Sequence, residues 1–268
     1  MNPHLVELNI TELCNRTCSF CPRAWDYPNQ NLNMTLSIAD LIAQQCIGFT
    51  DNIHLVGRGE PLLHPEFLDI VRIFSKNFSV KIVTNGDKLH DYIDELDNIL
   101  DLQSKNHTIT ICLYDDDNQY NHFKLLYSKY NDVKLYKTYD TGNNLTDDTL
   151  AKQQWLTNRA GAMPVNRLKN KNAPCYLPVN RVYIDYDGSV NLCCHDWKYK
   201  TVYGDIKKTS IATIWNNDLL NIKRKLVAGD RSCTNECSNC DVVDDPLKYI
   251  YNDYLDKQNL RIIQLHET

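Results

Sequence analysis

Three cysteines near the N-terminus constrain this chain more than any other feature. Cys14, Cys18 and Cys21 have the spacing C-x3-C-x2-C and follow an apolar segment, 4–10, that reads as a strand. Three thiolates on one loop can bind three irons of a 4Fe–4S cube and leave the fourth iron open to a substrate or cofactor. The alternative is a structural zinc site. Such a site requires four ligands in paired spacing, and no further cysteine lies near these three in the sequence.

Composition narrows the class of protein. The chain has 268 residues, enough for one large domain or one and a half, and a net charge of -5. It has no basic block typical of nucleic-acid binding, no signal-peptide pattern and no apolar run long enough to span a bilayer. We therefore expect a cytoplasmic protein that binds neither nucleic acid nor membranes. In a reducing compartment its eleven cysteines are better explained as metal ligands than as disulfides.

Strand and helix patterns alternate along the first half of the chain. The expected strands are 4–10, 53–56, 79–83, 108–113 and 133–137, and the expected helices are 35–47, 65–76, 92–102 and 122–130. This alternation predicts an α/β fold with a parallel sheet and right-handed crossovers. The segment up to about residue 165 is too short for eight βα units. We expect an open, partial TIM-like barrel of five or six strands.

Polar motifs follow several of these strands. Gly57-Arg58-Gly59-Glu60-Pro61 follows the second, Thr84-Asn85-Gly86 the third and Tyr114-Asp115 the fourth. Glycines at a strand end let the backbone approach a ligand closely, and a proline stops the strand. Each motif has a structural alternative. Asn-Gly is a common turn dipeptide, and the acidic residues after Tyr114 could cap the next helix.

Six cysteines lie in the last third of the chain. They are Cys175, Cys193, Cys194, Cys233, Cys237 and Cys240. Asp187-Gly188 between two short apolar runs predicts a β-hairpin, and the apolar spacing over 210–226 predicts a helix. A second amphipathic helix is expected over 247–265.

The spacing of the first three cysteines, with Phe20 directly before the last of them, resembles the signature of radical S-adenosylmethionine (SAM) enzymes. The resemblance implies that these thiolates hold a 4Fe–4S cluster whose open iron chelates SAM. Reduction of that cluster would produce a 5′-deoxyadenosyl radical that abstracts a substrate hydrogen. The loop around Phe20 would then contribute to cofactor binding.

The same resemblance assigns roles to the strand-end motifs. Gly59, Glu60 and Pro61 match the family's Gly-Gly-Glu-Pro motif, which holds the SAM amino group, with Arg58 in place of the first glycine. The resemblance places Thr84 and Asn85 near the SAM ribose and methionine. The role of Arg58 stays open.

Three residues are implied as catalytic or substrate-contacting. In relatives the end of the fourth strand faces the substrate, which implies Tyr114 and Asp115. Arg159 lies in Asn158-Arg159-Ala160-Gly161, a motif found at the end of the barrel in relatives with a C-terminal cluster domain. Its guanidinium suits the SAM carboxylate or a substrate hydroxyl or carboxylate. A surface arginine in a linker is the alternative.

The order of the later cysteines resembles the twitch or SPASM-type domain, in which a hairpin and a helix hold an auxiliary 4Fe–4S cluster. The resemblance implies that the ligands are Cys175, Cys193, Cys237 and Cys240, with Cys194 and Cys233 as the alternatives to Cys193 and Cys237. Zinc is the alternative metal. The cysteine count favours the shorter, single-cluster form. The expected domains are a radical SAM core at 1–165, a β-hairpin-plus-helix cluster domain at 166–245 and a C-terminal helix at 246–268.

These inferences lead to three functional hypotheses. The first is an oxidoreductase that uses SAM, two 4Fe–4S clusters and a flavodoxin or ferredoxin-type electron donor to oxidise a small polar molecule such as an amino sugar, cyclitol or alcohol. The second is a maturase that crosslinks, epimerises or forms a thioether in a ribosomal peptide substrate. The third is a non-catalytic iron–sulfur protein, which would have no need of the motifs around Glu60 and Thr84. The sequence leaves the oligomeric state open.

Overall fold

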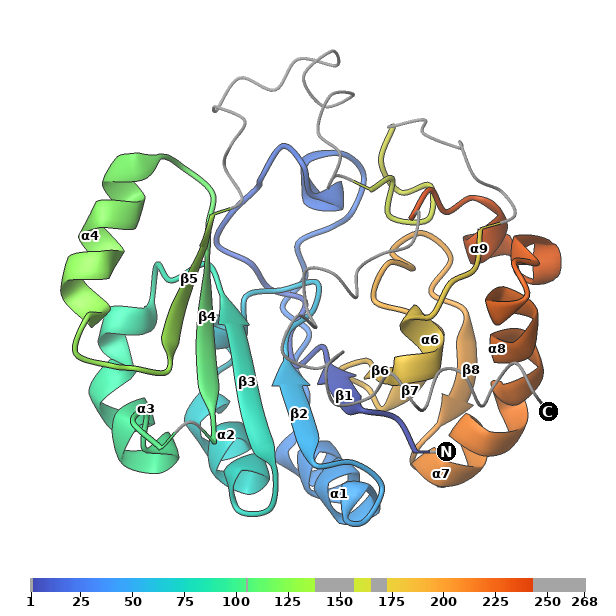
Figure 1. Cartoon of the computed structure of the whole chain (residues 1–268), viewed down its shortest axis with the longest axis horizontal. Helices are drawn as coiled ribbons and strands as arrows, with labels where there is room; N and C mark the ends of the chain where they lie inside the picture. Colours follow the sequence, from blue (N-terminus) through green and yellow to red (C-terminus); the bar gives the residue numbers. More distant parts are fainter. Residues whose placement is uncertain (1, 105, 138–156, 165–172, 243–268) are drawn as a thin grey trace.

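One mixed sheet organises the part of the chain that the computed structural model describes, residues 2–104, 106–137, 157–164 and 173–242. Its strand order is β5-β4-β3-β2-β1-β6-β7-β8, over eight strands in the described residues (Figure 1). The strands are β1 (Leu5–Leu8), β2 (Asn52–Leu55), β3 (Ser79–Thr84), β4 (Thr108–Leu113), β5 (Val133–Lys137), β6 (Arg181–Ile184), β7 (Ser189–Asn191) and β8 (Val202–Asp205). The first six are parallel, and β7 and β8 are antiparallel to their neighbours. The expected α/β partial barrel is confirmed.

Helices connect the parallel strands and cover the outer face of the sheet (Figure 1). They are α1 (Leu36–Cys46), α2 (Phe67–Ser75), α3 (Ile93–Leu100) and α4 (Asp117–Tyr127). The Thr35 hydroxyl caps α1 by accepting a hydrogen bond from the Ile38 amide. The Asp116 carboxylate caps α4 in the same way, which is why this helix begins at Asp117 and not at 122 as expected.

The two faces of the parallel sheet differ in polarity. Side chains that alternate along the strands toward the helices, such as Val6, Leu8, Ile53 and Leu55, are fully buried in one apolar core. The opposite face carries polar residues, including a buried ion pair between Glu7 on β1 and Arg181 on β6 with 2.7 Å between Oε1 and Nη1. The core therefore lies between the sheet and its helices, and the inner face of the partial barrel is polar.

The C-terminal segment extends this sheet directly. β6 pairs in parallel with β1, with Val6 opposite Val182, and the expected hairpin joins β6 to β7. Gly188 in its turn has a φ of +85°, a conformation that other residues rarely adopt. Figure 1 shows the loops after the parallel strands and the hairpin segment at the same end of the molecule.

Helix 210–226 is interrupted in the structure. It consists of α7 (Ile211–Thr213), a π-helical turn (Ile214–Asp218) and α8 (Leu220–Val227). The buried Lys223 ammonium donates a hydrogen bond of 2.7 Å to the carbonyl of Trp215 and lies over its ring. A side chain inserted beside the helical hydrogen bonds in this way is a known cause of such irregularities. The sequence pattern predicted one continuous helix, and in this detail it was wrong.

Short elements complete the described chain. They are α6 (Leu177–Asn180), α9 (Asn235–Ser238) and the 3-10 turns Pro22–Ala24, Pro61–Leu63, Leu89–Asp91 and Arg231–Cys233. The expected helix over 247–265 and both domain boundaries, at 165 and 245, lie outside the described residues. In the described segments, no helix has the length and apolarity needed to cross a membrane.

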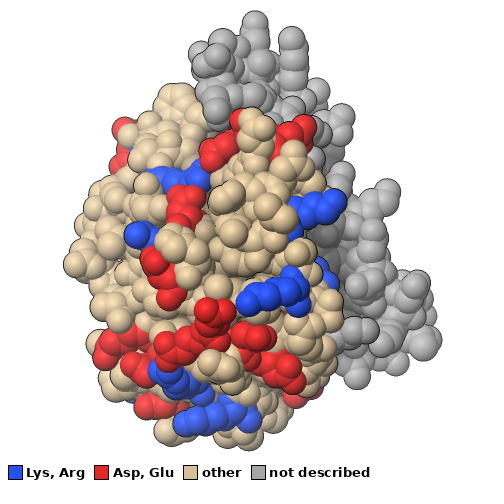
Figure 2. Space-filling model, turned by 90° about the vertical axis from the view of Figure 1, so that its left-hand side faces the viewer, with Lys and Arg blue, Asp and Glu red and all other residues tan. Residues whose placement is uncertain are grey.

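The side of the molecule that carries α3 and α4 bears mixed charges, with carboxylates in excess (Figure 2). Exposed acids on or next to α3 include Asp91, Asp94 and Glu95. Arg72 on α2 pairs with Asp69, with 2.9 Å between the charged atoms, and also with Glu95. Exposed pairs of this kind contribute little to stability. This side is therefore an ordinary solvated surface. The cysteine loop lies elsewhere, at the carboxyl ends of the strands.

Candidate active site

The loop after β1 brings the first three cysteines together. The amide of Cys21 donates a hydrogen bond of 2.9 Å to the carbonyl of Cys18. The side chain of Asn29 binds both the amide and the carbonyl of Cys14, each at 2.9 Å. All three thiols are half-buried and unpaired by disulfides. Burial raises the pKa of Cys14, and it raises that of Cys18 to about 12, with the neighbouring thiols contributing in the same direction.

The three thiols offer separate ligands for the irons of a cluster. Among the described residues, no three His, Cys, Asp or Glu side chains are close enough to share one metal ion. A 4Fe–4S cube is larger, and its thiolate ligands bind different irons. Three free thiols on one half-buried loop are therefore a suitable donor set for it.

Gly59 lets the strand-end motif after β2 lie directly against the cysteine loop. A Cβ at this position would lie 2.2 Å from the carbonyl oxygen of Thr11 and 2.7 Å from that of Leu13. The Glu60 amide donates a hydrogen bond of 2.8 Å to the same Leu13 carbonyl. Because the obstructing atoms are backbone, only glycine allows this approach.

Replacing Gly59 by alanine is expected to destabilise the metal-free protein by about 3 kcal/mol or more, because the cysteine loop must move away. Gly48→Ala is the matched control. A Cβ there meets nothing within 4 Å, and its φ of +72° adds only backbone strain, about 1 kcal/mol. Urea unfolding of both variants measures the difference. Equal losses of stability would contradict the argument from close approach.

Glu60 is buried and connects β2 to the end of β3. Its Oε1 accepts hydrogen bonds from the Thr84 hydroxyl at 2.6 Å and the Leu62 amide at 3.1 Å. Its Oε2 accepts one from the Asn85 amide at 2.8 Å. Burial nevertheless raises the pKa of Glu60 to about 7, against an ordinary value of 4.5. The structure thus places Glu60 beside Thr84 and Asn85, and Pro61 starts the next turn.

Glu60 should make the metal-free protein less stable as the pH rises. A carboxyl whose pKa is higher in the folded chain holds its proton more tightly there, so its contribution to stability is present at low pH. It is lost between the unfolded value near 4.5 and the folded value of about 7. We expect wild type to lose roughly 2–3 kcal/mol relative to Glu60→Gln between pH 5 and pH 8. Urea unfolding at the two pH values measures this, and parallel pH profiles would contradict it.

An arginine inside the cysteine loop connects it to β3 and β4. Arg16 donates two hydrogen bonds to Asp87, of 2.7 and 2.5 Å, and two to Asp115, of 2.9 and 3.1 Å. Phe20 packs against Tyr114 with ring centroids 5.2 Å apart. Asp115 is therefore held in an ion pair and Tyr114 is half-buried against the loop. Neither Arg16 nor Asp87 was predicted, because nothing local in the sequence shows that they pair.

The four predicted auxiliary ligands line one cavity. Cys175, Cys193, Cys237 and Cys240 are all among its lining residues, and the cavity is partly open to solvent. Burial raises the pKa of Cys237 well above its ordinary value and that of Cys240 to about 11. The alternatives Cys194 and Cys233 are not among the described residues that line this cavity. Four thiols around one cavity are a suitable donor set for a fully ligated cluster.

Arg159 lies beside this cavity. It and its two successors have left-handed backbone, with φ values of 48°, 52° and 86°. The adjacent Asn158 is fixed to Asp241 and Asn239 by hydrogen bonds of 2.7 Å. The Arg159 guanidinium donates to Nδ1 of His195, 3.3 Å away, and His195 lines the cavity. The pKa of His195 is lowered, first by burial and then by the positive charge of Arg159.

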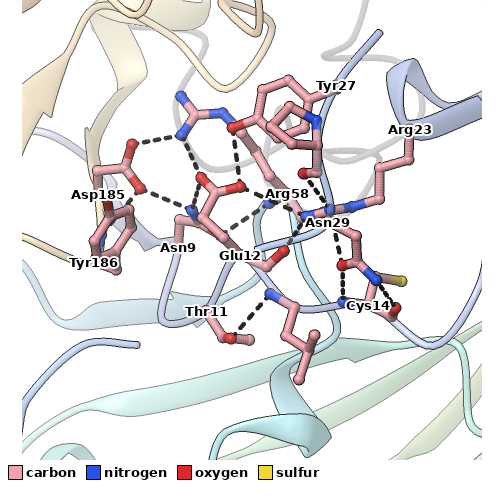
Figure 3. A network of polar contacts seen from close by, with 12 residues as sticks. Asn9, Thr11, Glu12, Cys14, Arg23, Tyr27, Asn29, Arg58, Asp185 and Tyr186 are labelled. Atoms are coloured by element: carbon pink, nitrogen blue, oxygen red, sulfur yellow. Dashed lines mark hydrogen bonds and ion pairs between the residues drawn. The ribbon is translucent and has the colours of Figure 1, made fainter. Parts of the chain in front are cut away.

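A buried network of charged and polar side chains lies between the two halves of the chain (Figure 3). Its charged members in the sheet and the cysteine loop are Glu12, Arg23, Arg58 and Asp185, and all four are buried. The guanidinium of Arg58 lies 3.1 Å from Glu12 Oε1 and 2.5 Å from Asp185 Oδ2. The only sign of this network in the sequence is the arginine between two glycines in the strand-end motif.

Two family models match this chain. The radical SAM superfamily model matches residues 8–110, and the SPASM model, described as an iron–sulfur cluster-binding domain, matches residues 175–241. The chain belongs to the radical SAM superfamily and carries a C-terminal SPASM domain. It is a radical SAM enzyme related to a SAM-dependent dehydrogenase, and both SAM and iron–sulfur clusters are implied as its cofactors.

Curated relatives include enzymes of this type. The SAM-dependent 2-deoxy-scyllo-inosamine dehydrogenase of Niallia circulans is 24% identical over 255 residues, which cover 89% of this chain and 93% of that protein. A SAM-dependent nucleotide dehydratase of Selenomonas ruminantium is 36% identical over 83 residues, which cover 30% of this chain and 29% of that protein.

Solved structures show the same fold. BtrN in complex with AdoMet and 2-DOIA superposes with a TM-score of 0.73 at 21% identity, covering 91% of this chain and 95% of that one. SuiB of Streptococcus suis bound to precursor peptide SuiA has a TM-score of 0.61 at 12% identity, covering 90% and 70%. At these identities the likeness concerns the fold alone.

Proposed function

We propose that this enzyme oxidises a small polar molecule, such as an amino sugar, cyclitol or alcohol, and that an auxiliary 4Fe–4S cluster accepts the electron. The observation that carries the proposal is the cavity lined by four cysteines, at the strand-end side of a sheet that also bears the three-cysteine loop. A cluster with four thiolate ligands has no open iron, so its role is electron transfer or structural support. The full-length relationship to a dehydrogenase favours electron transfer.

The chain provides a separate donor set for each cluster. Cys14, Cys18 and Cys21 would hold the cluster that binds SAM. Cys175, Cys193, Cys237 and Cys240 would hold the auxiliary cluster. When bound, SAM and the two clusters supply an acceptor for a substrate hydrogen atom and an acceptor for an electron.

The motifs at the strand ends would bind SAM. Glu60, fixed by Thr84 and Asn85, offers a buried carboxylate to the SAM amino group, and Gly59 brings the backbone against the cysteine loop. Phe20 and Pro61 complete this side of the site. Phe20 packs on Tyr114, which fixes its ring beside the end of β4.

The substrate would contact residues outside this SAM-binding group. Arg159, next to the auxiliary cavity, can donate hydrogen bonds to a substrate hydroxyl or carboxylate. Tyr114 and Asp115 remain candidates at the end of β4. Asp115 is engaged by Arg16, so a positioning role suits it better than proton transfer.

The proposed organisation is a radical SAM core at 1–165, an auxiliary-cluster domain at 166–245 and a C-terminal helix at 246–268. Each cysteine set then lies within one domain. A flavodoxin or ferredoxin-type protein is the proposed electron donor, because SAM cleavage requires an external reductant.

Isotope transfer tests the reaction. The reduced enzyme is incubated with SAM and with ring-deuterated 2-deoxy-scyllo-inosamine or other deuterated cyclitols and amino sugars. We expect deuterium in 5′-deoxyadenosine and one carbonyl product for each SAM consumed. SAM cleavage without deuterium transfer from any of these compounds would overturn the proposal. Transfer from a deuterated peptide in its place would favour the peptide maturase.

A further inference from the structure

Arg58 contacts both halves of the molecule through one buried guanidinium. It follows β2, and only 2% of the residue is exposed. Its Nη1 binds Glu12 in the radical SAM half and Asp185 in the β6–β7 turn, while Nη2 donates to the carbonyl of Asp196 at 3.2 Å. Figure 3 shows Glu12 and Asp185 converging on it.

On one side, these contacts fix the cysteine loop. Glu12 lies two positions before Cys14 and is fully buried. It also receives a hydrogen bond of 2.9 Å from the Tyr27 hydroxyl and an ion pair of 3.5 Å from Arg23, which lies two positions after Cys21. The Arg23 Nε donates to the carbonyl of Arg58 at 3.0 Å. Both ends of the three-cysteine segment are therefore fixed to Arg58.

On the other side, the same guanidinium holds the segment after Cys193. The carboxylate of Asp196 accepts hydrogen bonds from the amides of Tyr199 and Thr201, each at 2.9 Å. Trp197, next to Asp196, packs edge-on against Tyr27 of the cysteine loop with ring centroids 4.7 Å apart. The loop that carries Cys193 thus lies against the loop that carries the first three cysteines.

The charge of Arg58 makes it hard to replace. Without Arg58, Asp185 would lose the ion pair that the described residues give it, while Glu12 would keep only the longer pairs with Arg23, at 3.5 Å, and Lys200, at 3.6 Å. A buried charge without its partner is strongly unfavourable. Asn9 bridges the same two carboxylates, donating at 3.0 and 2.7 Å, but it brings no charge. A lysine carries the charge but has no planar fork to reach Glu12, Asp185 and the Asp196 carbonyl together.

We propose that Arg58 is a positioning residue that fixes the auxiliary-cluster segment against the three-cysteine loop. Its presence between Gly57 and Gly59 thereby sets how the two cysteine sets are placed relative to each other. The expected effect on the interaction between the clusters rests on the proposed function, because this effect requires two bound clusters. The consequence for local mobility does not.

Arg58→Met tests the proposal, with Arg72→Met on α2 as the matched control at an exposed ion pair. Two readouts are made on the anaerobically reconstituted protein. Hydrogen exchange measures local opening in 11–16 and 194–201, and EPR of the fully reduced protein measures the magnetic interaction between the clusters. We expect Arg58→Met to keep its iron and to exchange about tenfold faster in those two segments, with 67–84 unchanged. The EPR interaction should change as well.

Wild-type exchange in both segments, or equal acceleration throughout the chain, would overturn the proposal. If Arg58→Met does not fold, Arg58→Lys and Asp185→Asn are tested in its place. We expect faster hydrogen exchange in 194–201 in both variants, and unchanged exchange there would overturn the proposal. Wild type with only one cluster would refute the proposed function, but the exchange experiment would still decide the role of Arg58.

Discussion

Replacing Cys14, Cys18 and Cys21 together by alanine is expected to lower the iron content from about eight to about four atoms per chain and to abolish SAM cleavage. The three thiols occupy one loop, and no disulfide engages them. The four cysteines of the auxiliary cavity lie in the C-terminal part of the chain, outside this loop, and stay intact in this variant. Iron and labile sulfide after anaerobic reconstitution, together with 5′-deoxyadenosine formation under reduction, measure both effects.

The control for this experiment is Cys46→Ala, a cysteine in the apolar core that contributes to neither set. It should retain full iron and full SAM cleavage. A wild-type protein with about four irons that falls to none in the triple variant would contradict the expectation. In that case the second set binds zinc or nothing, and a redox-neutral radical reaction becomes the better hypothesis.

Single alanine substitutions of Cys193 and Cys237 should each remove about four irons per chain, whereas Cys194→Ala and Cys233→Ala should keep all of about eight. The reason is geometric. Cys193 and Cys237 line the cavity with Cys175 and Cys240, and their sequence neighbours do not belong to the described lining. Reductive SAM cleavage in the absence of substrate should continue in all four variants, because the first cysteine loop is unchanged. Substrate oxidation should fail in the Cys193 and Cys237 variants.

The contrary result is a loss of iron in the Cys194 variant with full iron in the Cys193 variant, or a loss in the Cys233 variant with full iron in the Cys237 variant. It would mean that cluster assembly moves these loops and selects the neighbouring thiol. Iron analysis and EPR of each reduced variant distinguish the two outcomes, and circular dichroism shows whether each variant is folded.

Local patterns in the sequence predicted the sheet well. The expected strands at 108–113 and 133–137 have the bounds that the structure shows. Apolar alternation and turn residues act over a few positions, so they can be read without knowing the fold. The two failures arise from side-chain contacts within the helices themselves, and the acidic cap was one of the alternatives that the sequence left open. α4 begins early because of the Asp116 cap, and the helix at 210–226 is interrupted where Lys223 reaches back to Trp215.

The site also combines features that local sequence patterns reveal with contacts that they do not. Spacing within a short segment led to the three-cysteine loop, and Gly59 and Glu60 lie together with Thr84 as their order along parallel strands implies. The partners of Arg58 could not be found in this way, because Glu12, Arg58 and Asp185 come from three distant parts of the chain. A buried ion pair needs only two side chains and no repeated pattern, so a single sequence carries almost no signal for it.

The pairing of β6 with β1 has a consequence for how this chain could evolve or be engineered. In a chain cut after the radical SAM core, β1 would lose four residues of parallel pairing, from Leu5 to Leu8, and become an exposed edge. Unpaired edges of buried apolar strands promote aggregation. The C-terminal segment therefore covers the edge of β1 in the radical SAM half, in addition to supplying cysteines. Exchange of this segment between homologues should succeed only when the donor carries its own strand to complete the sheet.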